Sequence, residues 1–148
     1  MAAKDEELYT AARSGRLPEV ERLLNEGASP DAEKYGDPAL GAAAKEGRLE
    51  VVRALVRAGA KLEATDEFGN TALMQATSSG KHDCVEFLLG AGADVHAANE
   101  LGDTALHRAA RWGQLQCARL LVGAGADATK QNHPYLGETA LDNARANN

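Results

Sequence analysis

The chain has 148 residues, with 16 lysines and arginines against 22 aspartates and glutamates, and its formal net charge is −6 at pH 7. This length suits one domain, and an acidic balance without a basic stripe argues against a nucleic-acid partner. Residues 1–7 are polar and acidic where a signal peptide would be basic and then apolar, and no apolar run is long enough to span a membrane. We therefore expect no membrane partner and a location in the cytoplasm or nucleus.

A short sequence motif recurs along the chain at a nearly fixed spacing, and the leucines of successive copies are 32, 33, 33 and 35 residues apart. A constant period of this length is typical of a repeat architecture. The period predicts repeats at about 1–32, 33–65, 66–98 and 99–131 and a partial repeat at 132–148. In chain order the copies read Leu8-Tyr-Thr-Ala-Ala, Pro38-Ala-Leu-Gly-Ala-Ala, Thr71-Ala-Leu-Met-Gln-Ala, Thr104-Ala-Leu-His-Arg-Ala and Thr139-Ala-Leu-Asp-Asn-Ala.

The fourth repeat shows the elements expected of one unit. Residues 99–103 predict a turn, because asparagine, glycine and aspartate favour the backbone conformations that turns require. Thr104 stands at a helix N-cap position, and Gly113 is expected to end a short helix over residues 105–112. A second helix is predicted over residues 115–123. Its buried face is expected to consist of Leu115, Ala118, Leu121 and Val122.

Neither predicted helix is long enough to be stable alone in water. Each must bury a face of small residues against the equivalent helix of the next repeat, and alanines such as Ala43, Ala76 and Ala109 permit close approach. The sequence therefore predicts an all-α solenoid of stacked helix–turn–helix units with projecting loops, in a single domain over residues 1–148.

The two cysteines, Cys84 and Cys117, occupy equivalent positions in adjacent repeats. Stacked helices lie about 8–10 Å apart, which exceeds the usual Cα separation across a disulfide. We therefore expect two buried, reduced thiols, which agrees with a cytoplasmic or nuclear location.

No pattern in the sequence is typical of an active site. No two of the four histidines have the i, i+4 spacing of a helical metal site, and His82 and Cys84 face different sides of a helix. Gly90 and Gly92 follow a helix, whereas a dinucleotide-binding fingerprint follows a strand and precedes a helix. None of the serines lies in the strand-to-helix elbow of a hydrolase. We therefore expect no enzyme activity, no metal and no cofactor.

The unit resembles the ankyrin repeat, in which a turn with glycine is followed by T-P-L-H-x-A-A, a glycine, an apolar second helix and G-A-D. The endings Gly92-Ala-Asp and Gly125-Ala-Asp match letter for letter, and the resemblance covers about residues 5–146. Alanine replaces the proline at all four T-P-L-H sites. The resemblance implies a hydrogen bond between the threonine and the histidine, which only His107 retains, since Gly41, Met74 or Asp142 replaces it elsewhere.

The resemblance also implies that a partner protein meets the turn tips and first helices, on the concave side. The third position of the turns is large and apolar in each case, and the only tryptophan stands at the exposed end of a first helix. An exposed apolar strip of this kind is typical of an interaction surface, and tryptophan, tyrosine and arginine are common at binding hot spots. The predicted partner-binding residues are Tyr35, Phe68, Asn70, Leu101, Asp103, Arg111, Trp112 and Tyr135.

The leading hypothesis is a monomeric module without enzyme activity, which binds one partner protein as an adaptor or an inhibitor. One alternative is an architectural ankyrin segment of a larger protein, and another is an engineered binder on the same scaffold. The tip side chains also have a purely structural alternative, in which they fold back onto the neighbouring turn. His96 lies at a spacing that resembles an acceptor site for hydroxylation, where asparagine is usual, and a solvent-facing turn residue is the alternative.

Overall fold

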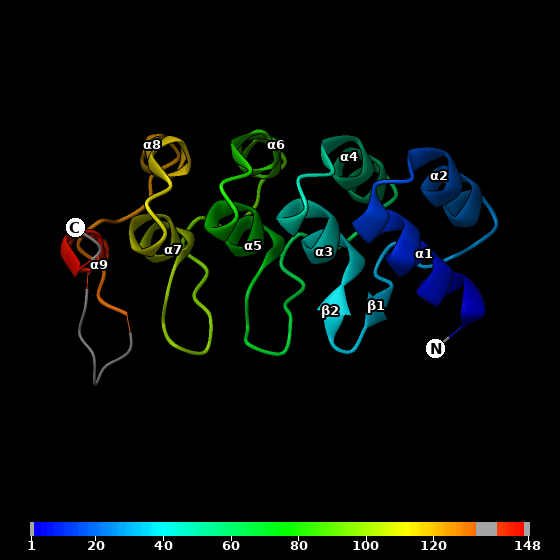
Figure 1. Cartoon of the computed structure of the whole chain (residues 1–148), viewed down its shortest axis with the longest axis horizontal. Coiled ribbons are helices and arrows are strands. Elements are labelled where there is room, and N and C mark those ends of the chain that lie inside the picture. The colour runs from blue at the N-terminus through cyan, green and yellow to red at the C-terminus, as the bar shows by residue number, and fades with distance from the viewer. Residues whose placement is uncertain (1, 133–138, 147–148) are drawn as a thin grey trace.

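The computed structural model describes residues 2–132 and 139–146, and it shows two parallel rows of short helices with loops projecting beyond one row (Figure 1). The first helices of the repeats form the row from which the loops project, and the second helices form the other row. The first row contains α1 (Ala3–Ser14), α3 (Ala39–Lys45), α5 (Ala72–Ser78), α7 (Ala105–Arg111) and α9 (Ala140–Ala146). The second row contains α2 (Leu17–Asn25), α4 (Leu49–Arg57), α6 (His82–Gly90) and α8 (Leu115–Gly123). The predicted all-α repeat solenoid is confirmed.

Each helix packs against its equivalent in the next repeat, and the two rows pack against each other within each repeat. The same small or aliphatic residue recurs at each contact because the period is constant. The fully buried positions are Ala11, Ala43, Ala76 and Ala109 in the first row and Leu23, Leu55, Leu88 and Leu121 in the second. The core is therefore a continuous layer between the rows, and burial of each leucine side chain contributes about 1.5–3 kcal/mol.

Helix α7 begins and ends as the sequence predicts, to within one residue. The Thr104 hydroxyl accepts a hydrogen bond from the His107 N–H, and His107 Nδ1 accepts one from the Thr104 N–H at 3.1 Å, so the two residues form a capping box. Trp112 is the C-cap, and Gly113 adopts a φ of 66° after it.

The threonine–histidine bond implied for the family is therefore present at Thr104 and His107. In the last repeat a carboxylate replaces the imidazole, and Asp142 Oδ2 accepts hydrogen bonds from the N–H and hydroxyl of Thr139, both at 2.9 Å. These bonds hold the pKa of Asp142 below its ordinary value.

The predicted buried face of α8 is partly wrong. Leu121 is fully buried, but Leu115 is 62% and Val122 is 55% exposed. Their equivalents on α4, Leu49 and Val56, are half-buried against the core. Helix α6 packs beside α4, whereas no second-row helix follows α8 within residues 2–132 and 139–146. The exposure therefore depends on the neighbouring repeat and not on α8 itself.

The two cysteines are buried and free, as predicted. Burial raises the pKa of the Cys84 thiol to about 11 and raises that of Cys117 as well. Both side chains pack as small apolar residues in the second row.

Candidate functional site

The first loop is a tight hairpin that presents Tyr35 at its tip. Strand β1 (Glu33–Lys34) pairs with β2 (Asp37–Pro38), and Tyr35 and Gly36 form the turn with φ values of 54° and 75°. Two positive φ values are typical of the turn type that connects two-residue hairpins. The Tyr35 side chain is 87% exposed at this turn.

A side chain at the start of the second and third loops holds each tip in place. In the second loop, Asp66 Oδ1 accepts hydrogen bonds from the N–H groups of Phe68 and Asn70, both at 2.9 Å. In the third loop, Asn99 Oδ1 accepts equivalent bonds at 3.0 Å from Leu101 and Asp103. Local bonds of this kind fix the loop backbone, so the tip side chains project from a defined support.

The loops are also bonded to one another. Asn99 Nδ2 donates to Asn70 Oδ1 at 2.9 Å, and Asn132 Nδ2 donates to Asp103 Oδ1 at 3.1 Å. The Glu100 N–H donates to the Phe68 carbonyl at 3.1 Å. The second and third loops are therefore joined, and the tips of Phe68 and Leu101 are held beside each other.

Two of the predicted partner-binding residues are buried in this arrangement. Asn70 is only 8% exposed and Asp103 is fully buried, since both lie at the bonded bases of the loops. Arg111 is half-buried, and its Nη1 pairs with Asp103 Oδ2 at 2.8 Å. A buried carboxylate that lost this partner would be costly, so Arg111 stabilises the third loop.

The remaining predicted side chains that the structure describes are exposed. Phe68 is 60%, Leu101 51% and Trp112 57% exposed. We define the apolar strip as Tyr35, Phe68, Leu101 and Trp112. The predicted contact at Tyr135 lies outside the described residues.

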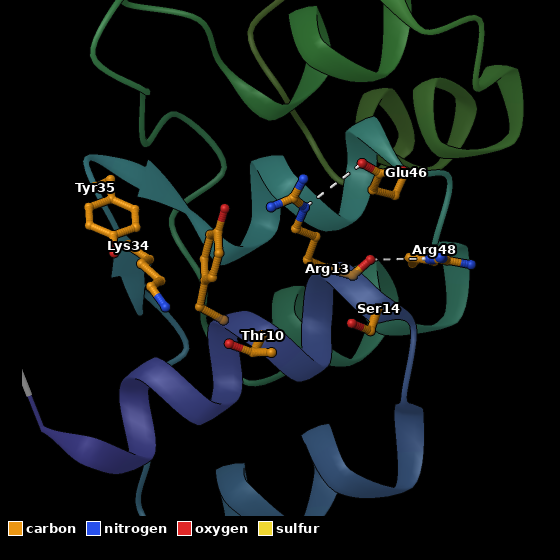
Figure 2. A pocket seen from close by; sticks show the side chains of 8 residues that line it. Thr10, Arg13, Ser14, Lys34, Tyr35, Glu46 and Arg48 are labelled. Carbon is orange, nitrogen blue, oxygen red and sulfur yellow. Dashed lines mark hydrogen bonds and ion pairs between the residues drawn. The ribbon is translucent and has the colours of Figure 1, made fainter.

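A cavity near the N-terminal end shows that tips and helix ends share one surface (Figure 2). Its volume is about 510 Å³, and both Tyr35 and Glu46 line it. Glu46 lies two periods of 33 residues before Trp112, and Tyr35 lies two periods before Leu101. Leu101 and Trp112 therefore hold the equivalent positions in the fourth repeat.

A smaller cavity of about 180 Å³ lies between the tips of Tyr35 and Phe68. Asp37, Lys45, Asp66, Glu67 and Gln75 contribute its polar side chains. Asp37 Oδ1 is buried and has no hydrogen-bond partner among the described residues, although Asp37 Oδ2 accepts from the Tyr9 hydroxyl at 2.8 Å. The loop-bonding position that Asn99 and Asn132 occupy later holds Asp66 here, and an ionised carboxylate supplies no donor.

Sequence reasoning missed the basic side chains of the larger cavity, Arg13, Lys34 and Arg48. Charge counts over whole repeats do not reveal them, because acidic residues elsewhere in the same repeats offset them. Comparison of equivalent positions could have found Arg13, which lies three periods before Arg111.

The structure brings no other candidate groups together in the part of the chain that it describes. No cluster of three or more histidine, cysteine, aspartate or glutamate side chains is placed there to hold a metal ion. His96 is exposed, and its N–H donates to Asp94 Oδ1 at 2.8 Å in a turn, so its modification stays a prediction. None of the described helices combines the length and the apolar character that crossing a membrane requires.

The sequence matches a family model described as ankyrin repeats (three copies), over residues 4–66 and again over residues 58–132. These two matches together extend over most of the chain, and they coincide with the stacked helix pairs and bonded loops of the structure. The chain therefore belongs to the ankyrin-repeat family.

Proposed function

We propose that this chain is an interaction module without enzyme activity, which binds one partner protein through the apolar strip and acts as an adaptor or an inhibitor. Ankyrin repeats are generally modules of protein–protein interaction. The observation that carries the proposal is the exposure of four large apolar side chains at tips and a helix end of successive repeats, with fractions between 51% and 87%.

Two features support a binding role for these side chains. Tyr35 stands on a paired hairpin, and Phe68 and Leu101 stand on loops that are bonded to each other, so a partner would bind without paying to order these tips. Aromatic side chains add large contact areas with few rotatable bonds, and they are enriched among binding hot spots.

The setting that we propose is the cytoplasm or the nucleus, where thiols such as Cys84 and Cys117 stay reduced. The net charge of −6 supports a partner other than nucleic acid, since nucleic-acid binding requires clustered cations along one face.

An unbiased pull-down with the full chain tests the proposal. The strip variant is Phe68→Ala/Trp112→Ala, and the matched control is Leu115→Ala/Val122→Ala, which removes equally exposed apolar side chains from α8. We expect the wild-type chain and the control to retain a partner that the strip variant loses.

Thermal unfolding of all three proteins completes this test. Exposed substitutions change stability by about 0.5 kcal/mol or less, so similar midpoints are expected. A partner that the strip variant retains, or a large loss of stability in that variant, contradicts the proposal.

A further inference from the structure

The larger cavity carries an excess of positive charge in an otherwise acidic chain. Three of its lining residues are cationic, Arg13, Lys34 and Arg48, and Glu46 is the one carboxylate among them. The chain as a whole has a net charge of −6. A cavity with this balance attracts an anionic group.

The cations of the cavity differ in how strongly they are already engaged. Lys34 Nζ lies 2.6 Å from Glu6 Oε1, so its charge is compensated. Arg13 Nε lies 4.0 Å from Glu46 Oε1, and both side chains are largely exposed, so this pair is weak. Arg13 also interacts with the Tyr9 hydroxyl, so its neighbours in the cavity are one weakly paired carboxylate and one neutral phenol.

Arg48 is held at the edge of the cavity through its Nε atom. That atom donates to the Arg13 carbonyl at 3.3 Å (Figure 2). The Nη atoms have no hydrogen-bond partner within the described residues. Gly15 makes room for this side chain, since a Cβ at residue 15 would lie 2.7 Å from Arg48 Cδ. The Arg48 guanidinium thus lies beside the end of α1, and its Nη donors are unpaired within the described residues.

One hydrogen bond between first-row helices in the fourth repeat has no counterpart beside this cavity. In the fourth repeat, Arg108 Nε donates to Ser78 Oγ at 2.8 Å, which links α7 to α5. The equivalent residue in the second repeat is Ala42, two periods earlier, and it is too short to reach Arg13. The Ser14 hydroxyl also lines this space and has no hydrogen-bond partner in the described part of the chain.

We infer that this cavity binds an oxyanion, a carboxylate or a phosphoryl group, on the segment of the partner protein that covers Tyr35. Arg13 and Arg48 supply the charge and the N–H donors, and the Ser14 hydroxyl supplies one more donor. Glu46 competes with the ligand for Arg13. This inference rests on the proposed function, and it names the chemistry of the partner at one end of the apolar strip.

Two small probes test the inference without the partner, N-acetyl-O-phosphoserine amide and N-acetylglutamate amide, with N-acetylglutamine amide as the neutral control. The experiment is an NMR titration of the full chain with each probe. It measures the chemical shifts of the Ser14 backbone N–H and of the side-chain Nε–H groups of Arg13 and Arg48. We expect saturable shifts with at least one anionic probe and none with the neutral one. Phosphoserine alone would identify a phosphoryl ligand, and both probes would identify a general carboxylate or phosphoryl site.

Substitutions test which side chains bind the anionic probe. We expect Arg13→Gln and Arg48→Gln each to weaken it about tenfold or more, because each removes charged hydrogen bonds. Glu46→Gln is expected to strengthen it about two- to fivefold by removing the competing carboxylate. Lys81→Gln is the matched control, since Lys81 is the equivalent of Arg48 in the next repeat and is expected to have no effect.

Absence of saturable shifts with both anionic probes would overturn the inference. It would equally be overturned by binding that Arg13→Gln and Arg48→Gln leave unchanged or that Lys81→Gln weakens as much. These outcomes are independent of the pull-down. If the probes bind at the cavity but the partner still binds the strip variant, the proposed function is rejected and the inference about the cavity is not.

Discussion

At the scale of single residues, side chains of one repeat form hydrogen bonds with side chains of the next. Tyr9 is a buried residue of the first repeat, and its hydroxyl donates to Asp37 Oδ2 in the second at 2.8 Å. Burial, followed by this bond to a carboxylate, raises the pKa of Tyr9 to about 12 from an ordinary value of 10.0.

The first prediction concerns alkaline pH. Because folding favours the neutral phenol, the stability that Tyr9 contributes is complete below pH 10.0 and is lost as the pH rises from there to about 12. In the folded chain, phenolate absorbance should therefore show a late-titrating component. Tyr9→Phe should remove that component and cost about 1 kcal/mol at neutral pH through the lost hydrogen bond. A late component that survives in Tyr9→Phe would belong to another tyrosine and refute the assignment.

At the scale of a helix, the neighbouring repeat decides which apolar residues matter. Leu121 and Leu115 lie on the same helix, α8, yet the first is fully buried and the second is 62% exposed. Composition alone does not distinguish the two leucines.

The second prediction compares these leucines. Leu121→Ala should cost about 2–5 kcal/mol, because it removes a packed side chain and leaves a cavity. Leu115→Ala should change stability by about 0.5 kcal/mol or less. Urea unfolding of both variants measures the difference. Equal losses in the two variants would show that α8 is packed on both faces.

At the scale of the whole molecule, the helices of each repeat pack mainly against those of the adjacent repeats in the described part of the chain, so stability accumulates along the row. Paired interfaces continue from α1 to α9 in the first row and from α2 to α8 in the second. Strong interfaces between adjacent repeats favour unfolding in one cooperative step.

The third prediction follows from these continuous interfaces. We expect the free chain to sediment as a monomer of 15.5 kDa and to unfold in a single transition, followed in parallel by circular dichroism and Trp112 fluorescence. Trp112 reports on the fourth repeat, whereas circular dichroism reports on all helices. Transitions that do not coincide would show that the fourth repeat unfolds separately, and a larger mass would reject the monomer.

The sequence by itself determined the repeat length, the helix positions and the leucine and alanine core. These features follow from local preferences and from a constant period, which places like residues at like contacts. Thr104 and Gly113 mark the start and the end of a helix in any context, because caps act on the backbone next to them. The positions of the tips Tyr35, Phe68 and Leu101 were also predictable, but their exposure was not, because the sequence also allowed them to fold back onto the neighbouring turn.

Only the tertiary structure decided what lies between repeats. It buried Asn70 and Asp103 in bonds to the next loop, and it left Leu115 and Val122 exposed. It also brought Arg13 of the first repeat and Lys34 and Arg48 of the second together around one cavity. Such features depend on pairs of side chains from different repeats. The burial or charge of one residue is then set by the size and donors of a residue about 33 positions away.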